Sequence, residues 1–199
     1  MDREIRQMRS VASEFQTRED GEDLKIEGYF AVFNSIYDIG AGMSEEVAPG
    51  AFSETLSGDI RALVNHDTTL VLGRTSAHTL ELREDTRGLW GSISINPNDT
   101  DAMNLYQRVK RGDVSQCSFG FDILEEDTEI RENGDVHWTI KKVRLYEVSC
   151  CTFPAYESTN ISARSEERDR LLERKAEAWR TKMKERINNV KSTTPEEED

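Results

Sequence analysis

Apolar residues recur at every second position through several segments of this chain, and this alternation restricts the chain to a strand-rich fold. The segments are separated by residue pairs that favour tight turns, so consecutive strands are expected to pair as antiparallel hairpins. The predicted hairpins are residues 11–32 with a turn at Asp20-Gly21, residues 80–95 with a turn at Asp85–Gly88, and a third that turns at Asn133-Gly134 and returns along residues 136–148.

Helical patterns are fewer than strand patterns. Residues 51–56 follow Pro49-Gly50 and are expected to form a short helix. Residues 101–111 are a stronger candidate, because Thr100 or Asp101 can cap the first turn and Gly112 suits the left-handed residue at a helix end. Many short strands with few helices predict a mainly β protein of the α+β class, built as a small closed antiparallel β-barrel.

The last part of the chain changes character after residue 163. From residue 165 charged residues dominate, and single apolar residues recur at spacings of three and four, as in an amphipathic helix with a stripe narrow enough for a coiled-coil seam. Either packing on the chain's own domain or docking on a partner or a second copy would cover that stripe. It comprises Leu172, Ala176, Trp179, Met183, Ile187 and Val190.

Three regions are therefore expected along the chain. Residues 1–163 would form the barrel domain, with residues 1–10 as a flexible lead, and residues 165–191 would form the charged helical tail. Residues 192–199 contain almost nothing to bury, and this acidic terminus is expected to be disordered.

The charge balance excludes several function classes. The 199 residues include 39 acidic and 26 basic side chains, a formal charge of −13, which argues against nucleic acid as the main partner. No apolar run approaches the roughly 20 residues of a membrane span. The first residues lack the apolar stretch of a secretory signal, so a soluble protein that is not exported by this route is expected.

Cysteine usage gives no sign of a disulfide framework or a zinc site. The chain has Cys117, Cys150 and Cys151, an odd number with two adjacent, and lacks the paired spacing that zinc ligands show. Reduced thiols in a cytosolic compartment are expected, with no metal and no other cofactor.

Three polar residues stand inside otherwise strand-like apolar runs: His66, Ser118 and Glu147. In a strand through residues 116–123, Ser118 points away from the apolar face, whereas Cys117 lies on it. Ser115 is at an odd position, like Cys117 and Phe119, and so would share the apolar face. A buried carboxylate in so apolar a run needs a partner, and histidine is a suitable one; a position of Glu147 on a solvated face is the open alternative. The three residues permit a serine, histidine and carboxylate triad, yet each also has an ordinary structural explanation.

Several short motifs occur in a characteristic order and spacing. They are residues 26–34, residues 47–52, Asn65-His66-Asp67 with Leu72-Gly73-Arg74, Asp85 through Gly88-Leu89, Ser118-Phe119-Gly120-Phe121, and Glu147-Val148-Ser149 followed by Pro154-Ala155. Over about residues 24–163 the sequence resembles the prohead proteases of tailed bacteriophages, capsid-maturation serine proteases distantly similar to the herpesvirus assemblins. The resemblance implies a herpesvirus-protease-like closed barrel surrounded by helices.

The same resemblance implies roles for the three residues: His66 as general base, Ser118 as nucleophile and Glu147 as the orienting carboxylate. It also implies cleavage of a scaffold protein, or of the scaffolding part of the major capsid protein precursor, and of the protease itself. This activity would take place inside the immature shell in the host cytoplasm. Assemblins stabilise the oxyanion with an arginine pair. No such pair is found here after Glu147. Arg74 is a candidate donor to the oxyanion, but a structural role is the preferred interpretation of this residue.

Two alternatives remain open at this point. A cysteine protease would use Cys117 with the same base, and a non-catalytic, protease-like module would bind capsid or scaffold through its tail helix. Self-association is also open, because the tail stripe suits a homo-oligomer.

Overall fold

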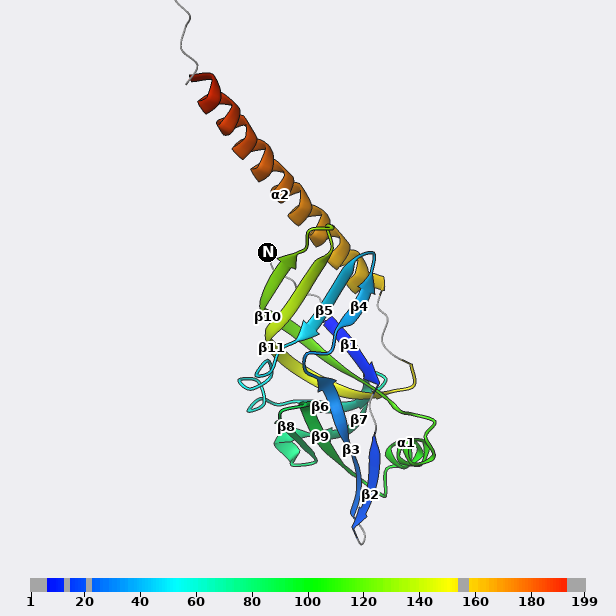
Figure 1. Cartoon of the computed structure of the whole chain (residues 1–199). Coiled ribbons are helices and arrows are strands. Elements are labelled where there is room, and N and C mark those ends of the chain that lie inside the picture. The colour runs from blue at the N-terminus through cyan, green and yellow to red at the C-terminus, as the bar shows by residue number, and fades with distance from the viewer. Residues whose placement is uncertain (1–6, 13–14, 21–22, 154–157, 193–199) are drawn as a thin grey trace, which may run out of the picture.

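The computed structural model describes residues 7–12, 15–20, 23–153 and 158–192, and this part of the chain is rich in strands, with two α-helices (Figure 1). It belongs to the α+β class. The elements are β1 (Gln7–Ala12), β2 (Gln16–Asp20), β3 (Asp23–Val32), β4 (Tyr37–Gly40), β5 (Met43–Val47), β6 (Arg61–Val64), β7 (Asp67–Arg74), the 3-10 turn η1 (Thr75–Ala77), β8 (Leu80–Glu84), β9 (Gly88–Ile95), α1 (Thr100–Arg111), β10 (Gln116–Ile130), β11 (Val136–Cys151) and α2 (Ser158–Ser192).

The strands form two sheets. The first has the order β1-β10-β11-β5-β4, and β6 also pairs with β11 and carries β7; the second has the order β2-β3-β9-β8. Most neighbours are antiparallel, but β5 and β6 both run parallel to β11.

The expected closed antiparallel barrel is wrong for the described residues, which form two open sheets. Alternation and turn residues predict which consecutive strands make hairpins. The same patterns do not predict how β5 and β6 pair. Both strands reach β11 through longer connections and run parallel to two successive parts of β11. Two helices accompany the sheets in this part of the chain, and they do not surround them.

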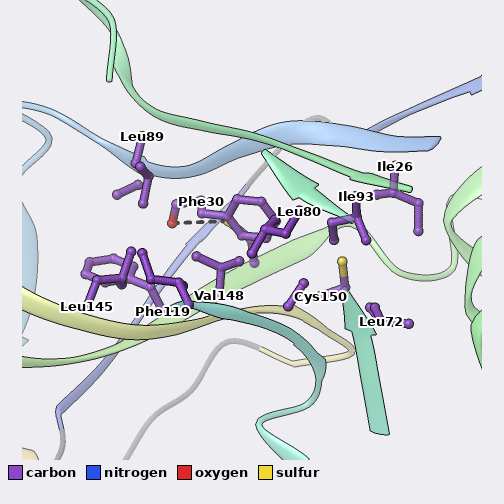
Figure 2. Packing of buried hydrophobic residues seen from close by; sticks show 14 of the residues in the cluster. Ile26, Phe30, Leu72, Leu80, Leu89, Ile93, Phe119, Leu145, Val148 and Cys150 are labelled. Carbon is purple, nitrogen blue, oxygen red and sulfur yellow. Dashed lines mark hydrogen bonds between the residues drawn. The ribbon is translucent and has the colours of Figure 1, made fainter. Parts of the chain in front are cut away.

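The hydrophobic core lies between the two sheets. Figure 2 shows Phe30 and Ile93 of the second sheet facing Phe119 and Val148 of the first, and all four side chains are buried. Phe119 also contacts Phe52 edge to face, with ring centres 5.4 Å apart. Burying a large apolar side chain contributes about 1.5–3 kcal/mol, so this interface holds β10 and β11 firmly in place.

All three predicted hairpin pairs are present as antiparallel neighbours: β2 with β3, β8 with β9, and β10 with β11. Gly21, in the first predicted turn, lies outside the described residues. One strand was expected over residues 11–17, but residues 11 and 12 belong to β1 in the first sheet and residues 16 and 17 to β2 in the second. Residues 7–10, expected within a flexible lead, belong to β1.

The helix predicted at residues 101–111 is confirmed as α1. Asp99, rather than Thr100 or Asp101, caps it by accepting the backbone N–H groups of Asp101 and Ala102 at 2.9 and 3.2 Å. Gly112 follows it with a φ of 86°, the left-handed conformation expected at a helix end.

The short helix expected at residues 51–56 is wrong, because this segment forms turns. Ala51 and Phe52 are buried in the core, and the backbone N–H of Phe52 donates to the Glu84 carboxylate at 2.9 Å. These tertiary contacts outweigh a local pattern of only six residues.

The tail is helical, and α2 starts before the predicted residue 165. Figure 1 shows α2 extending well beyond the strands as a single rod. Arg164 is 2% exposed and anchors the first turns of α2. It forms ion pairs with Glu45 and Glu126, and its guanidinium lies 4.4 Å from the centre of the Trp138 ring.

Trp179 of the predicted stripe is 61% exposed. The coiled-coil seam and the division into a domain at residues 1–163 and a tail at residues 165–191 stay predictions, and residues 193–199 of the acidic terminus lie outside the described part.

Candidate active site

His66 lies at the tip of the β6–β7 hairpin. Asn65 and His66 form a two-residue loop with φ values of 48° and 62°, the left-handed pair that a tight hairpin of the I′ type requires. Outside glycine this conformation costs about 1–2 kcal/mol per residue. Two hydrogen bonds offset it: the Asn65 N–H donates to the Cys150 carbonyl at 3.0 Å, and the Thr152 N–H donates to the Asn65 side chain at 2.9 Å. The hairpin tip is thereby fixed against β11.

The imidazole of His66 is paired with the carboxylate of Glu147. Nδ1 of His66 lies 2.7 Å from Oε1 of Glu147, and Glu147 is only 3% exposed. Its other oxygen accepts the hydroxyl of Ser149 at 2.6 Å, and that hydroxyl accepts the backbone N–H of His66 at 3.2 Å. Because a carboxylate only accepts hydrogen bonds, the proton of the neutral imidazole sits on Nδ1, and Nε2 is left as a base.

Ser118 lies on the strand next to this pair. In the β10–β11 ladder Ser118 is opposite Ser149, and Gly120 is opposite Glu147, so these residues share one face of the sheet. The side chain of Ser118 is fully buried, and its hydroxyl donates to the backbone carbonyl of Arg9 at 2.8 Å. The structure thus joins His66 to Glu147 directly. It places Ser118 one strand away, with its hydroxyl bonded to β1.

The other face of β10 belongs to the core. Cys117 is fully buried there, and its thiol donates to the backbone carbonyl of Tyr29 at 3.0 Å. It is therefore on the opposite side of the strand from Ser118. Ser115 precedes β10 and is exposed.

Cys151 is a neighbour of His66 that the sequence did not single out. Its sulfur lies 3.8 Å from Nε2 of His66, and burial, reinforced by the negative charge of Glu147, raises the pKa of this thiol to about 12. Ser149 and Arg9 were missed as well. Strand parity from Glu147 would have placed Ser149 and Cys151 on its face; nothing in the sequence pointed to Arg9.

Arg74 is not part of this cluster. Its guanidinium donates to the exposed Asp59 at 2.7 Å, which holds the pKa of that carboxyl well below its usual range. Among the residues that the structure describes, no group of three or more His, Cys, Asp or Glu side chains could hold a metal ion. No helix in the same part of the chain is both long and apolar enough to cross a membrane.

The sequence matches the family model described as caudovirus prohead serine protease over residues 12–174, which include all three candidate residues. The chain belongs to this family. It is also 32% identical over 148 residues to the prohead protease of Enterobacteria phage HK97, covering 72% of this chain and 61% of that protein. The chain therefore spans about three fifths of the length of that relative.

Among solved structures, the fold is similar to that of the bacteriophage T4 capsid assembly protease gp21. The TM-score is 0.43 with 10% sequence identity, covering 74% of this chain and 99% of the other. The family is one of serine proteases, so Ser118 beside the pair of His66 and Glu147 is the candidate catalytic arrangement. A base whose tautomer is fixed by a buried acid can activate a neighbouring hydroxyl.

Proposed function

We propose that this protein is the serine endopeptidase of phage capsid maturation. It cleaves the scaffold protein, or the scaffolding part of the major capsid protein precursor, inside the prohead in the host cytoplasm, and it also cleaves itself. The observation that carries the proposal is the 2.7 Å contact between His66 and Glu147 beside Ser118. The relative named as a prohead protease supports a role in the maturation of the prohead.

Ser118 acts as the nucleophile. Its hydroxyl is a weak nucleophile until a base takes its proton, and a neutral imidazole has the appropriate proton affinity at neutral pH. In the reacting complex the hydroxyl turns from the Arg9 carbonyl to Nε2 of His66. Its oxygen then attacks the scissile carbonyl, and His66 passes the proton to the leaving amine as the C–N bond breaks. Water releases the acyl group by the same route.

Glu147 orients the imidazole and stabilises its cation. Burial makes a lone carboxylate costly, and here the hydrogen bonds from His66 and Ser149 satisfy both of its oxygens. When His66 gains a proton, the positive ring faces a negative carboxylate in a site with little water. This interaction is much stronger than at the surface.

The decisive experiment uses a recombinant capsid precursor from the same phage and intact-mass measurement. The unchanged chain should convert the precursor into two defined products, and Ser118→Ala should leave it intact while keeping the circular dichroism spectrum of the parent. Ser115→Ala is the matched control, because Ser115 is an exposed serine just before β10, and it should cleave as the parent does.

Processing by Ser118→Ala would show that the nucleophile is wrong. A chain that binds the precursor without changing its mass would instead be a non-catalytic assembly module. The masses of the products also locate the cleavage site.

A further inference from the structure

β1 lies at the edge of the first sheet, in a position that an extended substrate would suit. It runs antiparallel to β10, with Ser10 opposite Ser118 and Arg9 opposite Phe119. Adding an extended peptide to a sheet edge is a common mode of peptide recognition, because the ladder supplies main-chain hydrogen bonds and alternate side chains enter pockets. Here the strand at that edge belongs to the chain itself.

The contact between β1 and Ser118 involves the carbonyl of one residue. The Ser118 hydroxyl donates to the backbone oxygen of Arg9 at 2.8 Å. A serine protease must bring its hydroxyl to the carbonyl of the residue that precedes the scissile bond. In this structure the carbonyl at that hydroxyl is the carbonyl of Arg9, which belongs to the peptide bond between Arg9 and Ser10.

The side chain of Arg9 ends on a buried carboxylate. Its guanidinium donates to Glu45 through both Nε and Nη2, the latter at 2.8 Å, and Glu45 is only 2% exposed. Gln7 accepts from the same guanidinium at 2.9 Å, and the Phe121 ring lies 5.7 Å from it. A two-pronged contact between a guanidinium and a carboxylate is among the strongest and most selective polar contacts in proteins.

Arg9 also borders an open space. A cavity of about 380 Å³ is lined by Arg9 and Glu45 together with Phe119 and apolar residues of the β3–β4 region. Glu45 also accepts a hydrogen bond from the guanidinium of Arg164 in α2 at 3.3 Å. The carboxylate would therefore keep one cationic partner if β1 were absent. A pocket with a buried acid would then stand open next to Phe119, the residue that follows Ser118 in β10.

We propose that β1 occupies the substrate's place in this structure, and that Glu45 selects arginine or lysine at the residue preceding the scissile bond. This inference rests on the proposed protease function and adds its specificity. It makes β1 an internal competitor: a capsid substrate with a basic residue at the cleavage point must displace Arg9 from Glu45 before Ser118 can react.

The test compares two phosphonate probes that form the same ester with a reactive serine and differ only in one side chain. One probe carries a guanidine at the position before the warhead and the other a carboxylate. Intact mass over time measures labelling of the full chain. We expect the guanidine probe to label Ser118 at least tenfold faster, and Glu45→Gln to reduce that preference at least tenfold. Glu126→Gln should retain the preference, because Glu126 also pairs with Arg164 but does not line this cavity.

A second variant tests the occupancy of the site. Arg9→Ala removes the contacts to Glu45 and should react with the guanidine probe faster than the parent, whereas a purely structural role for Arg9 would slow the reaction. Equal labelling by the two probes, or slower labelling of Arg9→Ala, would overturn this inference. If neither probe labels the parent or Arg9→Ala, the failure lies with the proposed serine protease itself.

Discussion

Ser149 donates its hydroxyl hydrogen to Oε2 of Glu147 across 2.6 Å, the oxygen that His66 does not use. The same hydroxyl accepts the His66 backbone N–H at 3.2 Å. One buried side chain therefore holds both the Glu147 carboxylate and the hairpin that carries His66, and in the proposed mechanism it does not itself take the proton.

Ser149→Ala should lower kcat about tenfold and leave KM within about twofold of the parent value. The hydrogen bond removed is charge-assisted and worth about 1.5–3 kcal/mol, and its loss lets the His66 and Glu147 pair drift from the geometry that the reaction needs. Steady-state cleavage of a peptide substrate measures both constants.

The matched control for this variant is Ser92→Ala. Ser92 is also a buried serine that donates to a glutamate, Glu27, at 2.9 Å, but it lies in the second sheet. It should keep the parent kcat. An equal fall of kcat in both variants would indicate general loosening of the fold.

Glu147→Gln should reduce kcat/KM by roughly 10²–10⁴-fold with little change in stability. Glutamine keeps the size of the side chain, but it no longer opposes the imidazolium with a negative charge and no longer dictates which ring nitrogen carries the proton. The measurement is peptide cleavage, with Glu27→Gln as the control because Glu27 also accepts a serine hydroxyl, that of Ser92 at 2.9 Å, but lies in the second sheet. Undiminished cleavage by Glu147→Gln would remove the orienting role from this residue.

The sequence predicts the hairpins and the placement of Ser118 well, because both depend on local alternation. In β10, Cys117 and Phe119 face the core and Ser118 faces the other way, as the parity requires. It also pointed to histidine as the natural partner of Glu147, and the structure shows that contact. The order of the strands in the sheets could not be predicted from local alternation. Pairing of β11 with β5 and β6 depends on packing between distant segments, which is why a closed barrel was expected and two open sheets are found.

Arg9 illustrates what no sequence pattern could supply. Residues 1–10 look like a charged lead, with few apolar residues to fix them. The order of β1 comes from a buried acid, Glu45, 36 residues away in the chain, and from the edge of β10. No periodic pattern and no motif in the sequence marks a contact of this kind, so it becomes visible only in the folded structure.

Alkylation should not abolish the proposed protease activity near neutral pH. The pKa of the Cys151 thiol is raised to about 12, chiefly because burial disfavours the thiolate, so at pH 8 only about one molecule in 10⁴ carries the reactive form. Between about pH 7.5 and pH 9.5 the alkylation rate should rise about tenfold per pH unit without levelling off. Iodoacetamide labelling followed by intact mass gives this profile.

The parallel test of the thiol is Cys151→Ala, which should retain at least half of the parent activity. Cys117→Ala is the companion variant, since its thiol lies in the core on the far face of β10. Loss of activity in Cys151→Ala with unchanged stability would make that thiol, 3.8 Å from the base, the nucleophile in place of Ser118.

Phe119→Ala should destabilise the fold by about 3–5 kcal/mol, because it leaves a cavity where the two sheets meet. Phe119 is 1% exposed, and its ring packs against Phe52 and Phe121 at centre distances of 5.4 and 4.8 Å. Phe153 lies just after β11 and is 80% exposed, so Phe153→Ala should change stability by less than about 0.5 kcal/mol. Urea unfolding followed by fluorescence compares the two variants. A similar loss in both would mean that the core between the sheets does not hold β10 in place, and with it the position of Ser118.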